Sequence, residues 1–438
     1  MPGEVTLTDQ LGKEYLPVTG GSQVAYVLLE TKPTEMMAQV RMPLNLAIVL
    51  DRSGSMKGAK LKSVKEAVKM VIDRLDPTDY ISVVIFDDHA QTVIQSIPAN
   101  DKPGMQAYID TIRDAGGTAM SLGMMYGLNE LRRWSIPNAV NRMILLTDGV
   151  TYGVSGIQYR PYAELYSHYG VTENIPESER CRQLARVARE SGVAIYPLGI
   201  GKDWDEQLLD QVGQLSGGMP AEFIRNPEDA MSIFEQQLQS AVAVAVRNAT
   251  LTLRLPEGIK PKKAVKVLPI ISDLGPSVLF DRQIVISLGD LEKDSPQSVL
   301  VELEIGPRQA GLFRIAQAEL SYDVPLTGLV GEKMREDIKE TFTTDASLSA
   351  QVNPLVMNFV EKANAHRLVT RVLDEYRSTG KATTRLAPNV TRVLDPETQA
   401  ALEQINQGQQ ISAEQVKSIG NKTRKLTQRL DDLVLPEQ

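Results

Sequence analysis

The feature that most constrains the fold is a regular alternation of short apolar runs and amphipathic segments between residues 41 and 240. Residues 44–50 form a nearly continuous apolar run, as expected for a parallel strand buried on both faces. Residues 60–75 follow with apolar side chains at helical spacing. The alternation continues with strands predicted at 81–86, 143–146 and 193–200, and helices at 120–134, 177–190 and 227–239. Such alternation predicts a doubly wound α/β domain, with a parallel sheet covered by helices on both faces.

Between residues 241 and 345 the apolar period changes from that of a helix to that of a strand. Apolar side chains alternate at 251–255, 284–288, 299–305 and 316–322. This pattern predicts an antiparallel β-sandwich, although four or five strands are few for one. Residues 1–40 contain a strand candidate at 24–29 and otherwise look like loop. If residues 1–40 supply the missing strands, the α/β domain is inserted in the sandwich; otherwise the sandwich flanks it.

The region from 346 to 438 has the pattern of helices. Ser412 and Gln415 form a capping-box signature that marks a helix start. Apolar residues then recur at spacings of three and four, as in the seam of a coiled coil. We expect this stripe to pack on its own chain, with a dimer or partner seam as the alternative. The sequence therefore predicts four parts: 1–40, 41–240, 241–345 and 346–438.

The charge balance narrows the choice of partners and compartment. The formal net charge is -8, which argues against nucleic acid because phosphate binding needs a basic face. The one cysteine, Cys181, excludes an internal disulfide. The first residues lack a basic region followed by an apolar run, and no apolar stretch is long enough to cross a bilayer. We therefore expect a cytoplasmic protein without membrane insertion.

Three polar segments lie where the predicted strands and helices of the α/β region meet. DRSGS (51–55) follows the first strand, GGT (116–118) precedes the helix at 120, and TDG (147–149) follows the strand ending at 146. In open α/β sheets, ligands bind at the carboxyl ends of the strands. These segments are therefore candidates for a common binding site.

Together the segments resemble the metal-ion-dependent adhesion site (MIDAS) of von Willebrand factor A (VWA) domains. That site consists of a DxSxS loop, a threonine loop and an aspartate loop, and GGTAMSLGM also has the family's glycine in the helix after the threonine. The resemblance covers about residues 41–240 and implies a Rossmann-like VWA domain. It implies a metal set at five positions: Asp51, Ser53, Ser55, Thr118 and Asp148. It also implies that the two aspartates act mainly through bound waters.

The chemistry of this set suits a small, hard cation. Mg²⁺ prefers oxygen ligands in a near-octahedral arrangement and retains some waters. Three neutral hydroxyls and few direct carboxylates favour Mg²⁺ over Ca²⁺, although Mn²⁺ and Ca²⁺ remain possible. A metal held largely by neutral oxygens favours an anionic ligand at its open position. The residues therefore predict binding of an Asp or Glu side chain on a partner protein. Taken singly, each aspartate and serine would more often be a turn or capping residue.

A tyrosine-rich segment follows the aspartate loop. Its candidate partner-binding residues are Tyr152, Tyr159, Tyr162 and Tyr166. Tyrosine supplies rigid contact area with a polar tip, which favours a recognition surface. The alternative is an ordered loop that packs these rings on its own domain.

We predict a binding module rather than an enzyme. A metal-dependent phosphate-ester hydrolase would need a positioned base or nucleophile, and the sequence offers no evident one. An adaptor subunit of an AAA-type ATPase machine is a further alternative, which overlaps with the binding module. The three histidines are scattered, so their spacing predicts no zinc site.

Overall fold

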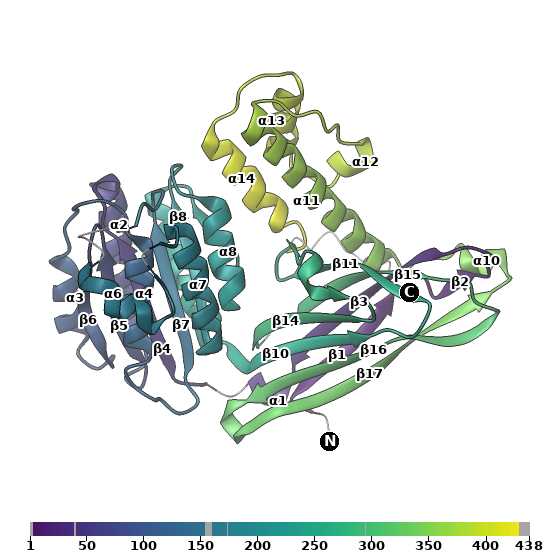
Figure 1. The fold of residues 1–438 in the computed structure, drawn as a ribbon, viewed down its shortest axis with the longest axis horizontal. Helices are drawn as coiled ribbons and strands as arrows, with labels where there is room; N and C mark the ends of the chain where they lie inside the picture. The colour runs from purple at the N-terminus through teal and green to yellow at the C-terminus, as the bar shows by residue number, and fades with distance from the viewer. Residues whose placement is uncertain (1–2, 39–40, 154–159, 173, 294, 429–438) are drawn as a thin grey trace. The chain divides into compact units, whose positions relative to one another are not determined.

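The computed structural model describes residues 3–38, 41–153, 160–172, 174–293 and 295–428 (Figure 1). The chain divides into two compact units: residues 40–244, and residues 1–39 together with 245–438. We call them the α/β unit and the strand unit. The four domain limits predicted from the sequence remain predictions. In the described ranges, no helix combines the length and apolarity needed to cross a membrane.

The described part of the α/β unit contains one sheet in the order β6-β5-β4-β7-β8-β9. Its strands are β4 (Leu44–Asp51), β5 (Tyr80–Phe86), β6 (Ala90–Pro98), β7 (Val140–Thr147), β8 (Val193–Ile200) and β9 (Glu222–Ile224). All neighbours pair in parallel except β5 and β6, which are antiparallel. The three central strands β4, β7 and β8 are buried along nearly their whole length, which is why they read as continuous apolar runs.

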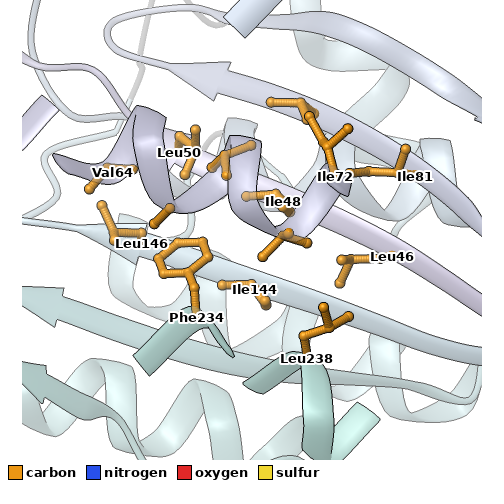
Figure 2. Close-up of a cluster of buried hydrophobic side chains, with 14 of the residues drawn as sticks. Leu46, Ile48, Leu50, Val64, Ile72, Ile81, Ile144, Leu146, Phe234 and Leu238 are labelled. Atoms are coloured by element: carbon orange, nitrogen blue, oxygen red, sulfur yellow. The ribbon is translucent and has the colours of Figure 1, made fainter. Parts of the chain in front are cut away.

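Helices cover both faces of this sheet, as the alternation predicted. One face packs against α2 (Ala59–Arg74), α3 (Lys102–Asp110) and α9 (Ala230–Val242). The other packs against α4 (Met120–Leu131), α6 (Ala163–His168), α7 (Glu177–Glu190) and α8 (Glu206–Ser216). Figure 2 shows the first core, where Ile48 and Ile144 from the sheet lie against Phe234 of α9. Alternate residues of each strand enter opposite cores, so the sheet has two apolar faces.

Among the described residues of this unit, the sequence missed five helices and strands: β6, α3, α6, α8 and β9. β6 is an edge strand whose side chains are only partly buried, so it lacks a continuous apolar run. β9 is three residues long. The helix predicted to reach residue 134 ends at Leu131, and the one predicted from 227 begins as a 3₁₀ turn at Pro227–Asp229. Boundaries of this kind depend on packing and capping more than on periodicity.

The described part of the strand unit contains two sheets and several helices. The first has the order β1-β3-β15-β11-β12 and the second β13-β14-β10-β16-β17-β2. The first contains β1 (Val5–Leu11), β3 (Gln23–Pro33), β15 (Gln297–Ile305), β11 (Ile259–Leu268) and β12 (Ser272–Asp273). The second contains β13 (Leu279–Phe280), β14 (Gln283–Glu292), β10 (Val244–Arg254), β16 (Gly311–Val324), β17 (Leu329–Thr343) and β2 (Tyr15–Pro17). One apolar core is shared by residues of both sheets.

The N-terminal strands complete this sandwich. β3 pairs with β15 along nine residues, with Val27 opposite Val301. The α/β segment lies between these strands in the sequence, so it is an insertion in the strand unit. The prediction that most of residues 1–40 is loop was wrong, because β1 and β2 lie there as well.

Helices at the C-terminus cover the outer face of the first sheet. They are α11 (Pro354–Thr379), α13 (Pro396–Asn406) and α14 (Ala413–Arg424), with short helices α1 (Glu35–Ala38), α10 (Ala346–Ser349) and α12 (Pro388–Thr391) elsewhere in this unit. Val416 and Ile419 of α14 are buried in a core with Leu28 and Leu300 of the sheet. The capping box at Ser412 is present. The described part of the predicted seam therefore packs on its own chain.

Candidate metal-binding site

Three loops meet at one edge of the parallel sheet because of strand register. β4 pairs in parallel with β7, with Leu50 opposite Leu146. Asp51, the next residue after Leu50, and Asp148, which follows the end of β7, therefore leave the sheet at the same edge. The loop before α4 joins them there, since the Gly54 N–H donates to the Gly116 carbonyl at 3.2 Å.

Asp51 is fully buried and held by two neighbours. Its Oδ1 accepts from the Ser53 N–H at 2.8 Å, and its Oδ2 accepts from the Thr147 hydroxyl at 2.6 Å. Burial raises the pKa of Asp51 to about 6, whereas the hydrogen bonds from Thr147 and Ser53 act in the opposite direction. The group is therefore ionised at neutral pH, although it lies in the interior.

A chain of polar contacts links the serines to the second aspartate. The Ser53 and Ser55 hydroxyls lie 3.0 Å apart, and the Ser55 hydroxyl donates to Asp148 Oδ1 at 2.6 Å. The other oxygen of Asp148 accepts from Lys60 Nζ at 2.5 Å. Asp148 is fully buried, so its carboxylate needs these partners.

Thr118 lies close to the same group of hydroxyls. A Cβ placed on Gly149 would lie 3.6 Å from Thr118 Oγ1 and 3.9 Å from Ser55 Oγ. The hydroxyls of Thr118 and Ser55 therefore both lie close to Gly149 in the aspartate loop. The Thr118 carbonyl accepts from the Thr151 hydroxyl at 2.9 Å and from the Tyr152 N–H at 3.0 Å. These bonds fix the threonine loop to the segment after Gly149.

The loop after β5 supports the arrangement from the side. Arg52 pairs with Asp87, with Nε 2.6 Å from Oδ2, and the Ala119 N–H donates to the Asp87 carbonyl at 2.7 Å. Asp87 is 3% exposed, so its carboxylate is buried. Arg52 compensates this buried carboxylate beside the DRSGS loop.

Glu177 is a buried residue that sequence reasoning missed. It lies in the first turn of α7, yet its Oε1 accepts from the Ser121 N–H at 2.8 Å and the Thr151 hydroxyl at 3.0 Å. Its Oε2 accepts from the Ser121 hydroxyl at 2.7 Å. A carboxylate at the start of α4 satisfies an N–H that the helix itself leaves open. Glu177 therefore links the start of α4, next to Thr118, to Thr151 in the segment after Gly149. No short-range signal in the sequence reveals this role of Glu177.

Two further residues of the site were not predicted. Thr147 holds Asp51, and it could have been found because it belongs to the TDG segment that carries Asp148. Lys60 holds Asp148 from the first turn of α2. A lysine there is unfavourable for the helix dipole, which is the one signal that could have singled it out.

The predicted tyrosines have different environments. Tyr152 is 81% exposed, whereas Tyr166 is fully buried with its hydroxyl 2.5 Å from that of Ser121. Tyr162 is partly exposed, and its hydroxyl lies 3.0 Å from His89 Nδ1. Tyr159 lies outside the described residues. Tyr166 is a core residue here, so it offers no ring to a partner.

The donor set fits a hard, octahedral cation. Three hydroxyls and two buried carboxylates come together, with contacts that join Ser53, Ser55 and Asp148 directly. Within the described ranges there is no group of three or more His, Cys, Asp or Glu side chains arranged to hold a metal. A site dominated by hydroxyls differs from such clusters, and it agrees with the preference of Mg²⁺ for oxygen ligands and retained waters.

Comparison with known proteins agrees with this geometry. Residues 45–239 match the model of the von Willebrand factor type A domain. The chain therefore contains a VWA domain, and VWA domains are a family of protein-interaction modules that commonly bind a divalent metal.

Relatives in sequence share only part of their length with this chain. An uncharacterized protein of Synechocystis sp. is 29% identical over 66% of this chain and 63% of its own length. The inter-alpha-trypsin inhibitor heavy chain H2 of Sus scrofa is 29% identical over 44% of this chain and 19% of its own length. The chain thus spans less than two thirds of either relative.

Solved structures are similar to this chain over nearly its whole length. A von Willebrand factor type A protein from Catenulispora acidiphila covers 96% of this chain and 96% of its own, with a TM-score of 0.71 and 18% identity. The ArnB paralog VWA2 from Sulfolobus acidocaldarius covers 97% of this chain and 99% of its own, with a TM-score of 0.57 and 16% identity. At these identities the likeness establishes the fold alone.

Proposed function

We propose that this protein is a Mg²⁺-dependent interaction module that binds an acidic side chain of a partner protein. Ser53, Ser55 and Thr118 would offer hydroxyl oxygens to the cation, while Asp51 and Asp148 would balance its charge. The bound cation would supply a positive centre with a position open to a carboxylate. Mn²⁺ and Ca²⁺ are the alternative cations.

One observation supports this proposal above the others: neutral hydroxyls meet over two fully buried carboxylates. Burying a carboxylate is costly unless it is paired, and among the described residues the donors to Asp51 are the uncharged Ser53 N–H and Thr147 hydroxyl. A structural role alone would be served as well by an uncharged side chain. A nearby divalent cation gives the buried charges a reason to be retained.

The surface next to the site suits protein recognition. Tyr152 is tied by its backbone to the carbonyl of Thr118, and its exposed ring projects from the segment after Gly149. A rigid aromatic side chain beside a metal-bound carboxylate would add contact area and select among acidic partners. Tyr162 would contribute at the edge of this surface.

Calorimetric titration with Mg²⁺ tests the metal site directly. We expect the wild-type protein to bind one Mg²⁺, and the double variant Asp51→Ala, Ser53→Ala to bind none. Ser82→Ala is a matched control because Ser82 is a buried serine of the same sheet that faces the Leu46 carbonyl. Absence of any Mg²⁺ response in the wild type, even with a carboxylate ligand present, would rule the proposal out.

Partner capture tests the second half of the proposal. A Mg²⁺-dependent pull-down should lose its partners on addition of EDTA and in the double variant. Tyr152→Ala should weaken capture while leaving the affinity for Mg²⁺ unchanged. Equal capture with and without the metal would show that partners bind elsewhere.

A further inference from the structure

Lys60 places a positive charge against one carboxylate of the proposed metal site. Its Nζ lies 2.5 Å from Asp148 Oδ2, while the Ser55 hydroxyl occupies Oδ1 of the same group. The side chain of Lys60 is 27% exposed and that of Asp148 is fully buried, so the pair is partly shielded from water. A Cβ on Gly201, just after β8, would lie 3.3 Å from Lys60 Nζ, which places the ammonium group at the same edge of the sheet.

The position of this lysine in its helix is unfavourable. Lys60 is the second residue of α2, where the partial positive charge of the helix N-terminus disfavours a cation. The first turn of α2 contains no acidic residue that would offset it. The contact with Asp148 is the interaction that compensates the ammonium group there.

The contact between Lys60 and Asp148 changes the net charge of the proposed metal site. Without a divalent cation, Asp51 and Asp148 carry two negative charges and Lys60 carries one positive charge. A divalent cation would balance the two aspartates by itself, and the ammonium group would then leave one surplus positive charge. Because Lys60 Nζ is bound to Asp148 Oδ2, its charge opposes a cation that is attracted to the same carboxylate.

We propose that Lys60 is a tethered competitor of the divalent cation, which stabilises Asp148 in the metal-free protein and weakens binding of the metal alone. The inference rests on the proposed function, because it assumes that Asp148 belongs to a metal site. The charge of Lys60 also affects how an acidic partner binds. An acidic ligand neutralises the surplus positive charge of the loaded site, so metal and ligand bind together more tightly than either binds separately.

Calorimetric titration of the full chain with Mg²⁺ alone tests this inference. We expect Lys60→Gln to lower the Kd for Mg²⁺ about tenfold, because a unit charge of the same sign leaves the site. Lys60→Arg, which keeps the charge, and Lys62→Gln, which removes an exposed lysine of the same helix, should match the wild type. Equal or weaker Mg²⁺ binding by Lys60→Gln would overturn the inference and leave the proposed function intact.

Thermal unfolding without metal provides the second readout. Lys60→Gln should melt below the wild type because the Asp148 charge loses its partner, and the double variant Lys60→Gln, Asp148→Asn should restore the loss. No restoration would contradict the pairing. If neither the wild type nor Lys60→Gln binds Mg²⁺, the proposed function fails; binding by Lys60→Gln alone would support the competition.

Discussion

Asp51 in the α/β unit and Glu340 in the strand unit are both buried carboxyl groups, but their surroundings differ. Both oxygens of Asp51 accept hydrogen bonds, and the pKa is about 6. Glu340 is 1% exposed, and among the described residues its Oε2 has no hydrogen-bond partner. Burial, with a smaller effect of the nearby Glu14 charge, raises its pKa to about 8.

The difference determines the charge of each group at neutral pH. Donors from Ser53 and Thr147 keep the pKa of Asp51 below neutrality, so it is a carboxylate at pH 7. Glu340 is a neutral acid at the same pH. Burial alone therefore does not determine the charge of a carboxyl group. The hydrogen-bond donors around it also contribute, and those of Asp51 belong to the loops of the proposed site.

The largest effect is expected from removing the support of the Thr118 loop. Glu177→Ala should lower the free energy of unfolding by about 3 kcal/mol, because it leaves the Ser121 N–H without its acceptor and the buried Arg180 without its carboxylate. Urea unfolding measures the loss, and Mg²⁺ binding should weaken with it. Glu177→Gln, which keeps the shape and one acceptor, should lose less. A loss of stability with unchanged Mg²⁺ affinity would confine Glu177 to a structural role.

The next prediction concerns Glu340 and its dependence on pH. Its pKa is raised in the folded state, so the protein should lose stability as the pH rises from about 4.5 through about 8. Glu340→Gln should remove this loss and stabilise the protein by about 2 kcal/mol at alkaline pH. Unfolding curves at acidic, neutral and alkaline pH measure the slope of stability against pH for the wild type and for the variant. Identical slopes for variant and wild type would show that folding does not raise the pKa of Glu340.

Thr147→Val would leave one oxygen of Asp51 without a hydrogen-bond donor, as Oε2 of Glu340 already is. It removes the hydroxyl that donates to Asp51 Oδ2 and should lower the stability by about 1 kcal/mol. The pKa of Asp51 should move upward from about 6, because a bond that favours the carboxylate is lost. Mg²⁺ titrations across neutral pH would show binding that requires more alkaline conditions than in the wild type. An unchanged pH profile would indicate that Thr147 contributes nothing to the ionisation of Asp51.

The smallest effect is expected at Glu319, a carboxylate whose arginine partners are exposed. Glu319 accepts from Arg254 and Arg335, whose side chains are 49% and 59% exposed, and these bonds lower its pKa to about 2. Arg335→Ala should cause a small loss of stability at neutral pH that fades as the pH falls toward 2 and in high salt. Unfolding of the wild type and of Arg335→Ala at low and high salt measures this loss of stability. A loss that is large and insensitive to salt would contradict this description.

The sequence by itself determined the α/β class and the composition of the proposed site. Continuous apolar strands between amphipathic helices specify a parallel sheet, and segments that follow such strands meet at its carboxyl edge. The positions of Asp51, Ser53 and Asp148 at one edge could therefore be predicted without coordinates. The sandwich was visible only in part, because its short or edge strands lack a regular pattern.

Only the tertiary structure decided which residues hold the site and in what state. Glu177 contacts Ser121 from 56 residues away and Lys60 contacts Asp148 from 88 residues away, and the partners of such contacts cannot be read from the local sequence. The exposure of Tyr152 and the burial of Tyr166 likewise depend on packing rather than residue type. The charge of a buried carboxyl depends on the donors that surround it, and those donors come together only when the chain has folded.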